Sequence, residues 1–401
     1  MSLSHGRQYL AIPGPSVMPD RVLAAMHRPA PNIYSGELVE MVPVIAAELK
    51  AVAQTSGNVA IYICNGHGVW EASLANVAAP GDKVLVAATG MFGLTWANMA
   101  TTLGLNVETL DFGKRAPIDP ARVEEVLAAD TAHEIKAVLT THVDTATSIR
   151  TDVKALRDAI DRANHPALLM VDCIASLACD RFEMDAWGVD VMIAGCQKGL
   201  MTPPGLAFVF FNEKADAARD ALDRVSPYWD WRPRTDPAAF YLYFCGTAPT
   251  HHLYGLREAL AMIAEEGLEN VWSRHQVLAE AVWAAFEHWG QSGPLELNVT
   301  DPSLRSWAVT AVRTGTEKAS ALRQWCEEQA GLTLGIGLGM APPDAPEWHT
   351  FFRVGHMGHT NPHMVLGAVA TIEAGLKAVE IQHHGGGAEA AASVIAAKTG
   401  G

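Results

Sequence analysis

The sequence has little that would indicate a membrane, secreted or nucleic-acid-binding protein. No run of about 18 apolar residues occurs, the length that a membrane-spanning helix needs, and the opening MSLSHGRQYL contains no apolar stretch of signal-peptide length. Basic residues are also scarce, since 29 Lys and Arg stand against 44 Asp and Glu, and a net charge of −15 repels nucleic acid and acidic membranes. These absences predict a soluble, cytoplasmic protein with no nucleic-acid or membrane partner.

Cysteine is sparse as well. The six cysteines are Cys64, Cys173, Cys179, Cys196, Cys245 and Cys326. They lack the paired spacing of a zinc site and the density of a disulfide-stabilised domain, so reduced, mainly buried thiols are expected. His359 and His363 lie four positions apart, but the Pro between them interrupts the helix that this spacing would require for a metal. No metal site is therefore predicted.

Apolar segments rich in β-branched residues alternate with helix-like segments between residues 58 and 212. This alternation is typical of an α/β fold with a mostly parallel, seven-stranded sheet and helices on both faces. The predicted strands are NVAIYI, KVLVAA, LNVETL, IKAVLTTH, ALLMVD, VMIAG and LAFVFF. Helices are expected at 68–78, 92–102, 120–128 and 152–163, the last capped by Thr151 or Asp152.

The length of 401 residues exceeds what one core usually accommodates, so a second domain is predicted. A helix beginning near His252 leads into it. The segments SWAVTAVR and TFFRVGH, with helices at 317–328 and 362–379, indicate a small α+β unit. The predicted division is an N-terminal arm (1–20), a large domain (21–260), a small C-terminal domain (261–385) and a tail (386–401) that ends in a short helix.

Two polar residues stand where ligands bind in open parallel sheets, just beyond the carboxyl ends of strands. Lys198 follows VMIAGCQ, and a partly desolvated amine there has a lowered pKa that suits Schiff-base formation. Asp172 ends ALLMVD, and a carboxylate at the end of a buried strand requires a cation. The protonated ring nitrogen of pyridoxal 5'-phosphate (PLP) would supply about 5 kcal/mol at roughly 3 Å and an effective dielectric of about 20. Singly, Lys198 could be a surface residue and Asp172 a helix cap; together they favour a PLP site.

Other strand ends supply further candidates. The segment NGHGVWE (65–71) turns from strand into helix, where backbone N–H groups attract a phosphate, although such glycine turns also occur without one. Phe92 could stack on a cofactor ring or fill the core. A hydroxyl-rich turn at 144–147 follows IKAVLTTH. The glycines at 335–339 lack the spacing of a dinucleotide-binding loop.

Two segments outside the strand ends also contain candidate functional residues. Arg353 lies on the apolar strand TFFRVGH, and a buried guanidinium requires an anion, either a substrate carboxylate or an internal partner such as Glu37. The run from Tyr228 to Arg234 is too aromatic for an ordinary linker. It predicts a loop at the substrate or at a subunit contact.

Nearly the whole chain resembles the class V aminotransferases, in particular the serine–glyoxylate, alanine–glyoxylate and pyridoxamine–pyruvate aminotransferases. The most specific segment is WGVDVMIAGCQKGLMTPPGL, with its Gln-Lys-Gly. The other matching segments are Pro13-Gly14-Pro15-Ser16, NGHGVWE, HVDTATS, HPALLMVDCIAS, TAPTHHLYGLREAL, GLENVWSRH, FRVGHMG and GGGAEAA. The resemblance implies a fold-type I homodimer that binds PLP in active sites shared between the subunits.

The resemblance also implies a role for each candidate residue. Lys198 matches the Schiff-base lysine, Asp172 the partner of the ring nitrogen, and Arg353 the clamp on the substrate α-carboxylate. Thr247 matches a phosphate contact donated by the other subunit, and Tyr34 lies in the N-terminal substrate loop. The cofactor-binding set further includes Gly66, His67, Gly68, Phe92, Thr147 and Gln197.

Departures from the family pattern affect the phosphate-binding segment and the substrate side, so the resemblance indicates the cofactor better than the exact substrate. Asn65-Gly66-His67 stands where the serine–glyoxylate branch usually has Ser-Gly-Thr, and Ser148 stands where Gly is typical. We expect transamination from a small L-amino acid, serine or alanine, to glyoxylate or pyruvate, with aspartate or pyridoxamine as alternative donors. A cysteine desulfurase is a further alternative, disfavoured because Gln197 rather than His precedes the lysine. A noncatalytic PLP-binding module would need an appended domain.

The choice of donor depends on counting cations, because each buried substrate carboxylate needs a positive or strongly hydrogen-bonding partner. Arg353 accounts for the α-carboxylate, which is sufficient for serine or alanine. An acidic donor needs a second cation, and the candidates are Arg232, Arg234, His251 and His252.

Overall fold

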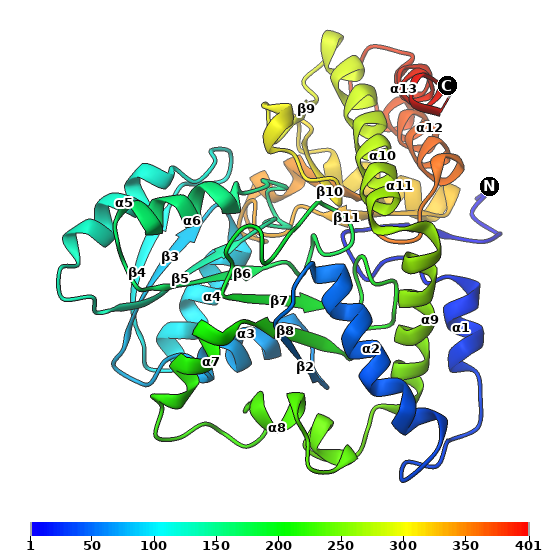
Figure 1. The fold of residues 1–401 in the computed structure, drawn as a ribbon. Coiled ribbons are helices and arrows are strands. Elements are labelled where there is room, and N and C mark those ends of the chain that lie inside the picture. The colour runs from blue at the N-terminus through cyan, green and yellow to red at the C-terminus, as the bar shows by residue number, and fades with distance from the viewer. Residues whose placement is uncertain (1, 400–401) are drawn as a thin grey trace.

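A computed structural model describes residues 2–399, which form two sheets with separate hydrophobic cores (Figure 1). The larger sheet lies with its helices in one part of the molecule, and the smaller sheet packs with α10 to α13 in the other. Within this range no helix is long and apolar enough to cross a membrane.

The large sheet has seven strands in the order β2-β8-β7-β6-β5-β3-β4. Neighbouring strands in this sheet pair in parallel, except that β8 runs antiparallel to both β2 and β7. The predicted seven-stranded, mostly parallel sheet is therefore confirmed. The strands are β2 (Asn58–Tyr62), β3 (Lys83–Ala88), β4 (Asn106–Asp111), β5 (Ile135–Thr141), β6 (Leu168–Asp172), β7 (Val191–Gly195) and β8 (Ala207–Phe211).

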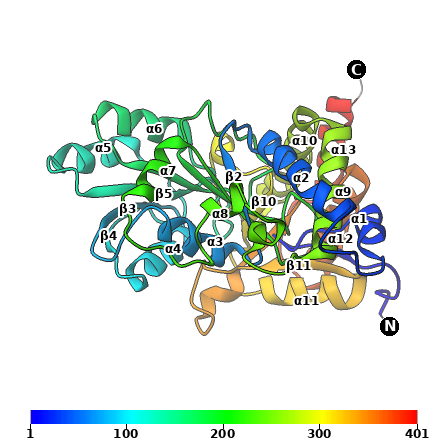
Figure 2. The ribbon, with the colours of Figure 1, turned by 60° about the horizontal axis from the view of Figure 1, so that its bottom comes forward.

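Helices cover both faces of this sheet (Figure 2). Alternate residues of a central strand enter opposite cores: Val138 of β5 packs in the core formed with α2, α5, α6 and α9, whereas Leu139 packs in the core formed with α3 and α4. Asp152 caps α6 by accepting the Ala155 N–H at 2.9 Å, as one of the two predicted caps. The helices are α2 (Glu37–Ala53), α3 (Gly66–Ala75), α4 (Met91–Thr102), α5 (Pro120–Ala129), α6 (Val153–Arg162), α7 (Glu213–Asp220) and α9 (Thr250–Glu266).

The smaller sheet has the order β1-β11-β12-β10-β9, with β1 parallel to β11 and the other pairs antiparallel. The last helix, α13, follows the glycine-rich segment as predicted, and Glu373 of α12 accepts the Gly386 and Ala388 N–H groups at its start. The elements are β1 (Tyr9–Ala11), β9 (Glu296–Leu297), β10 (Val309–Arg313), β11 (Leu332–Ile336), β12 (Phe351–Gly355), α10 (Leu268–Trp289), α11 (Ala319–Ala330), α12 (Pro362–Ala378) and α13 (Gly387–Thr399).

Several elements carry no clear local signal and were not predicted. The strand β11 contains Gly335, where a Cβ would lie 2.6 Å from Pro13 Cδ, and a glycine at this position obscures the strand pattern. The other unpredicted elements include α2, α10, β1, α1 (Asp20–Met26), α7, α8 (Arg232–Thr235) and the short 3-10 turns η1 (Phe240–Phe244), η2 (Gly290–Ser292), η3 (Pro302–Leu304) and η4 (Pro346–Thr350).

Candidate active site

Asp172 lies at the carboxyl end of β6 and is only 4% exposed. Its Oδ2 accepts a hydrogen bond from Trp70 Nε1 at 2.8 Å, and its Oδ1 accepts one from the Ile174 N–H at 2.7 Å. Burial, reinforced by the nearby Asp144 carboxylate, raises the pKa of Asp172 to about 7. A carboxylate held in this way favours a cationic partner, because such a partner relieves the cost of burying the charge.

Lys198 follows β7 on the neighbouring strand, and its Nζ donates a hydrogen bond to the Pro13 carbonyl. Burial lowers the pKa of Lys198 to about 8, and repulsion from Arg353 adds to this effect while Asp172 opposes it. The amine therefore has a much larger neutral fraction near neutral pH than a solvated lysine has. A neutral amine is the form that attacks a carbonyl carbon.

The N-terminal segment 13–16 forms one wall of the site. The Ser16 N–H donates to the Gln197 carbonyl at 2.9 Å, and Ser16 Oγ donates to the Lys198 carbonyl at 2.7 Å. Gly14 has a φ of +87°, and a Cβ there would lie 2.4 Å from Lys198 Cδ. Only glycine fits this position, because any other residue would be strained and would displace the lysine.

The start of α3 points its backbone N–H groups toward the same edge of the sheet. Asn65 caps the helix, and its side-chain Oδ1 accepts the N–H groups of His67 at 3.1 Å and Gly68 at 3.4 Å. A Cβ at Gly66 would lie 2.5 Å from Ile174 Cδ1, so the helix start packs closely on the loop that follows Asp172. The asparagine that departs from the family pattern thus acts as the helix cap.

Trp70 links the helix start to the carboxylate. Its indole donates to Asp172, while its ring lies 4.5 Å from the His67 ring and 6.3 Å from the Phe92 ring between centroids. Phe92 is in the first turn of α4. The predicted residues His67, Phe92 and Asp172 therefore surround Trp70, whose own role was not predicted.

Thr147 is fully buried in the turn between β5 and α6. Its Oγ1 accepts the Ile149 N–H at 3.4 Å, and its carbonyl accepts the Asn298 amide at 3.0 Å. Ser148, where glycine is typical of the family, has a φ of +61°. Its hydroxyl accepts the Ala311 N–H of β10 at 3.1 Å, so the substitution adds a link between the two parts of the molecule.

Arg353 lies on β12 and is 5% exposed. Its Nε donates to the Ile336 carbonyl at 2.7 Å and its Nη1 to the Thr145 carbonyl at 2.9 Å, which leaves Nη2 without a hydrogen-bond partner among residues 2–399. The suggestion that Glu37 is the internal partner of Arg353 is wrong, because Glu37 pairs with Arg28 at 2.8 Å instead. The arrangement suits a guanidinium that binds an external anion.

Two predicted residues lie apart from this cluster. Tyr34 is 87% exposed, and Thr247 is exposed on the segment between η1 and α9. Within residues 2–399 neither has a hydrogen bond to Lys198, Asp172 or Arg353. The single chain therefore exposes both residues and links neither to these three by a described hydrogen bond.

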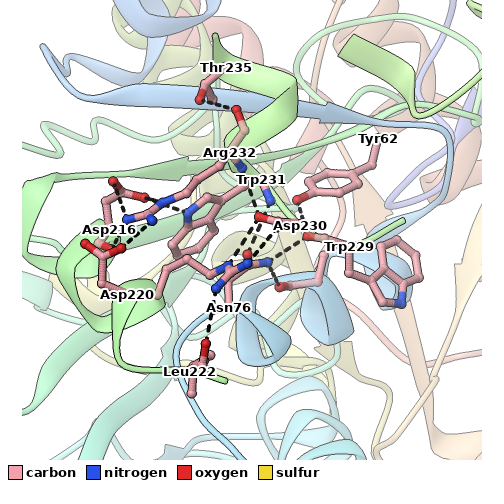
Figure 3. Close-up of polar contacts among 12 residues, drawn as sticks. Tyr62, Asn76, Asp216, Asp220, Leu222, Trp229, Asp230, Trp231, Arg232 and Thr235 are labelled. Carbon is pink, nitrogen blue, oxygen red and sulfur yellow. Dashed lines mark hydrogen bonds and ion pairs between the residues drawn. The ribbon is translucent and has the colours of Figure 1, made fainter. Parts of the chain in front are cut away.

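The aromatic run from Tyr228 to Arg234 packs into its own chain, and Figure 3 shows the polar contacts of its residues Trp229 to Arg232. Arg232 forms ion pairs with Asp216 at 2.9 Å and with Asp220. Arg234 is 1% exposed and donates only to backbone carbonyls, those of Ile61, Tyr228 and Tyr243. Arg232 is therefore paired with two aspartates, and Arg234 is enclosed by backbone carbonyls, although its Nε has no hydrogen-bond partner among residues 2–399. Neither arginine presents a free pair of terminal nitrogens to a substrate carboxylate, so the expectation that they bind one is not supported.

The family model described as aminotransferase class-V matches residues 65–354. The chain belongs to the class-V aminotransferases. Enzymes of this family use PLP, so the expected cofactor and enzyme class are confirmed.

This aminotransferase is similar to enzymes that act with glyoxylate. It is 39% identical over 381 residues to the serine–glyoxylate aminotransferase of Methylorubrum extorquens, covering 92% of this chain and 91% of that one. It is 37% identical over 368 residues to the L-aspartate–glyoxylate aminotransferase of Paracoccus denitrificans, covering 90% and 89%. The crystal structure of ureidoglycine–glyoxylate aminotransferase from Bacillus subtilis superposes with a TM-score of 0.87 at 26% identity, covering 98% and 100%.

The residues of this aminotransferase fit PLP. The buried Asp172 carboxylate suits a cationic ring nitrogen, and the Lys198 amine has the lowered pKa that covalent attachment needs. Gln197 Oε1 is buried and has no hydrogen-bond partner among residues 2–399, as expected for an amide that binds a ligand. Acidic, basic and amide groups thus converge at the end of β6 and β7.

The roles of Trp70, Pro13 and Asp144 were not predicted from the sequence. Trp70 and Pro13 belong to the matched motifs NGHGVWE and Pro-Gly-Pro-Ser, so the motifs signalled them without giving a partner. Asp144 follows a strand end and belongs to the matched motif HVDTATS, so both signals indicated its segment without giving its partners.

Proposed function

We propose that this enzyme transfers the amino group of a small L-amino acid, serine or alanine, to glyoxylate or pyruvate. The supporting observation is that Arg353 is the buried cation whose Nη2 has no hydrogen-bond partner among residues 2–399, whereas the four candidates for a second cation are engaged. Arg232 and Arg234 bind aspartates and carbonyls. His251 contacts the Arg28 carbonyl at 3.0 Å, and His252 contacts the Pro204 carbonyl at 3.2 Å.

In the proposed reaction, bound PLP supplies an electron-withdrawing ring that stabilises negative charge at the substrate α-carbon. Lys198 Nζ holds the cofactor before the substrate arrives and then moves the proton from the α-carbon. Asp172 keeps the ring nitrogen protonated, and Arg353 orients the α-carboxylate. The cofactor is further held by the other predicted residues, which are Gly66, His67, Gly68, Phe92, Thr147, Gln197 and, from a second subunit, Thr247.

Aspartate is the second candidate donor, and one observation favours it. Arg323 of α11 has a buried Nε without a hydrogen-bond partner among residues 2–399, and its Nη2 donates to Ser320 Oγ at the long distance of 3.4 Å. Its positive charge is close enough to contribute to the lowered pKa of Arg353. Arg323 could therefore pair with the side-chain carboxylate of an acidic donor.

A panel of donors tests the proposal. We expect serine or alanine to convert the bound cofactor to its amino form faster than aspartate or glutamate, measured by stopped-flow absorbance at saturating donor. If aspartate is faster than both small amino acids by tenfold or more, the small-donor proposal is wrong. Loss of that preference in Arg323→Ala, with Arg232→Ala as the matched control, would then assign the second cation.

A cysteine desulfurase reaction is disfavoured by the environment of Cys326. That thiol is fully buried in α11, where burial raises its pKa to about 12. A nucleophilic cysteine needs access and a readily formed thiolate. Neither property is found at Cys326.

We infer that the active form is a homodimer in which Thr247 and Tyr34 serve the partner's site. Both are exposed in the single chain, and an exposed aromatic side chain such as Tyr34 is typical of an interface. Tyr241, in the same surface region as Thr247, is also 59% exposed.

Mixed dimers test this arrangement. Lys198→Ala and Thr247→Ala chains are each expected to be impaired alone. Refolded together, they should regain activity, because a mixed dimer has one site with an intact lysine and an intact partner threonine. Absence of any gain, despite mixed dimers detected by differently tagged chains, would show that Thr247 does not act across subunits.

A further inference from the structure

Asp144 carries a fully buried carboxylate between α4 and the turn that follows β5. Its Oδ2 accepts the N–H groups of Phe92 at 2.8 Å and Gly93 at 3.2 Å. The first N–H groups of a helix lack partners inside the helix, and the N-cap residue Gly90 has no side chain to supply one. Asp144 therefore caps α4 from a distant part of the chain.

The glycine at the cap position makes room for this carboxylate. A Cβ at Gly90 would lie 2.5 Å from Asp144 Oδ1. The φ of Gly90 is 173°, which is extended backbone that any residue adopts, so space rather than backbone strain demands glycine here. The charge of Asp144 is also stabilised by the positive end of the α4 dipole.

The same carboxylate shapes the turn that anchors Arg353. Asp144 Oδ1 accepts the Ala146 N–H at 3.0 Å, and the Asp144 carbonyl accepts the Ser148 N–H at 2.8 Å. Between these bonds, the Thr145 carbonyl accepts Arg353 Nη1 at 2.9 Å. This bond joins the clamp on the small sheet to a turn of the large sheet.

We propose that Asp144 is a positioning residue that holds Phe92 against the cofactor ring and Arg353 against the substrate carboxylate at the same time. The inference rests on the proposed roles of Phe92 and Arg353. One side chain thereby couples the two binding elements, through three backbone N–H groups and one turn. Burial lowers the pKa of Arg353 to about 10, and the attraction of the Asp144 charge opposes this lowering, which shows that the two charges interact.

Asp144→Asn tests the proposal, because an amide has a single acceptor oxygen and cannot accept from both the α4 side and the Ala146 side. We expect KM for amino donor and keto acid to rise about tenfold to a hundredfold, with a smaller fall in kcat. The visible circular dichroism of the bound cofactor should change as well. Asp152→Asn is the matched control: within residues 2–399 the Asp152 side chain accepts only the Ala155 N–H, and asparagine caps a helix about as well, so KM and the dichroism should be unchanged.

Gly90→Ala is the second variant, and it decides the question if Asp144→Asn does not fold. Its Cβ would displace the carboxylate while keeping the charge, so the same rise in KM is expected. Unchanged KM and dichroism in a folded Asp144→Asn, or in Gly90→Ala, would overturn the positioning role.

Arg353→Ala separates this inference from the proposed function. It should raise KM for both substrates, and adding Asp144→Asn to it should raise KM little further if Asp144 acts through the arginine. Unchanged KM in Arg353→Ala would contradict the clamp itself. A raised KM in Arg353→Ala with fully additive effects in the double variant would leave the clamp intact and refute the coupling.

Discussion

Lys198→Ala is expected to lower kcat by at least about a thousandfold, within the range that a positioned general acid or base contributes, while the fold is retained. The substitution removes both the amine that binds the cofactor covalently and the group that moves the α-proton. Steady-state rates at saturating cofactor, with thermal unfolding in parallel, provide the measurement. Borohydride reduction and peptide mapping should label Lys198 in the wild type.

Lys214→Ala is a suitable control for this variant. Lys214 Nζ donates to the Ala167 carbonyl at 3.0 Å, just before the amino end of β6, whereas Asp172 lies at the carboxyl end of that strand. Its loss should leave the rate and the labelling unchanged. Normal turnover in Lys198→Ala, together with a reducible cofactor bond, would refute the assignment of the lysine.

The lowered pKa of Lys198 gives this prediction a pH dependence. The neutral amine attacks the cofactor aldehyde, and its fraction decreases as pH falls below the pKa of about 8. The rate of cofactor attachment should therefore rise with pH to a midpoint near 8. A midpoint above 10, typical of a solvated lysine, would contradict the buried environment described for Lys198.

Local patterns were sufficient to predict most of the large sheet and to place Asp172 and Lys198 at the ends of two of its strands. The central strands β6 and β7 are buried along their whole length, so they read as continuous apolar runs that end abruptly in polar residues. Asp172 and Lys198 could be expected to lie close together because β6 and β7 are parallel neighbours whose carboxyl ends meet at one edge.

Contacts between distant parts of the chain could not be predicted in this way. Trp70 meets Asp172 across 102 positions, and Pro13 meets Lys198 across 185 positions. These contacts depend on how α3 and the N-terminal segment pack on the sheet, which local periodicity does not determine. The motif resemblance identified the segments but not the atoms that meet.

The cations were the least predictable residues, because an arginine's partner can come from anywhere in the chain. Arg232 was a candidate for the substrate, yet Asp216 and Asp220 lie one turn apart on α7 and bind it. The spacing of the two aspartates can be read from the sequence, but the orientation of α7 toward the Tyr228–Arg234 segment cannot. Arg353 was correctly expected to be buried, whereas its suggested partner Glu37 was wrong.

Asp172→Asn is expected to weaken cofactor binding and to lower kcat by about 10² to 10⁴-fold. An attraction of about 5 kcal/mol between the carboxylate and a cationic ring nitrogen sets the upper limit of this loss, since each 1.36 kcal/mol corresponds to about a factor of ten. The neutral amide also accepts only one of the hydrogen bonds from Trp70 and Ile174. In Asp172→Asn, the effect of losing the charge must therefore be distinguished from the effect of losing a hydrogen bond.

A cofactor methylated at the ring nitrogen separates them, because its ring stays positive whatever residue faces it. If Asp172 acts by keeping the ring protonated, this cofactor should restore a substantial part of kcat in Asp172→Asn and should not improve the wild type. Asp180→Asn is the matched control: Asp180 is equally buried, with a pKa raised by burial to about 6, but it bonds to Ser306 and Trp307 instead. Equal rates for Asp172→Asn with the methylated and the ordinary cofactor would show that the carboxylate acts only through its bonds to Trp70 and Ile174.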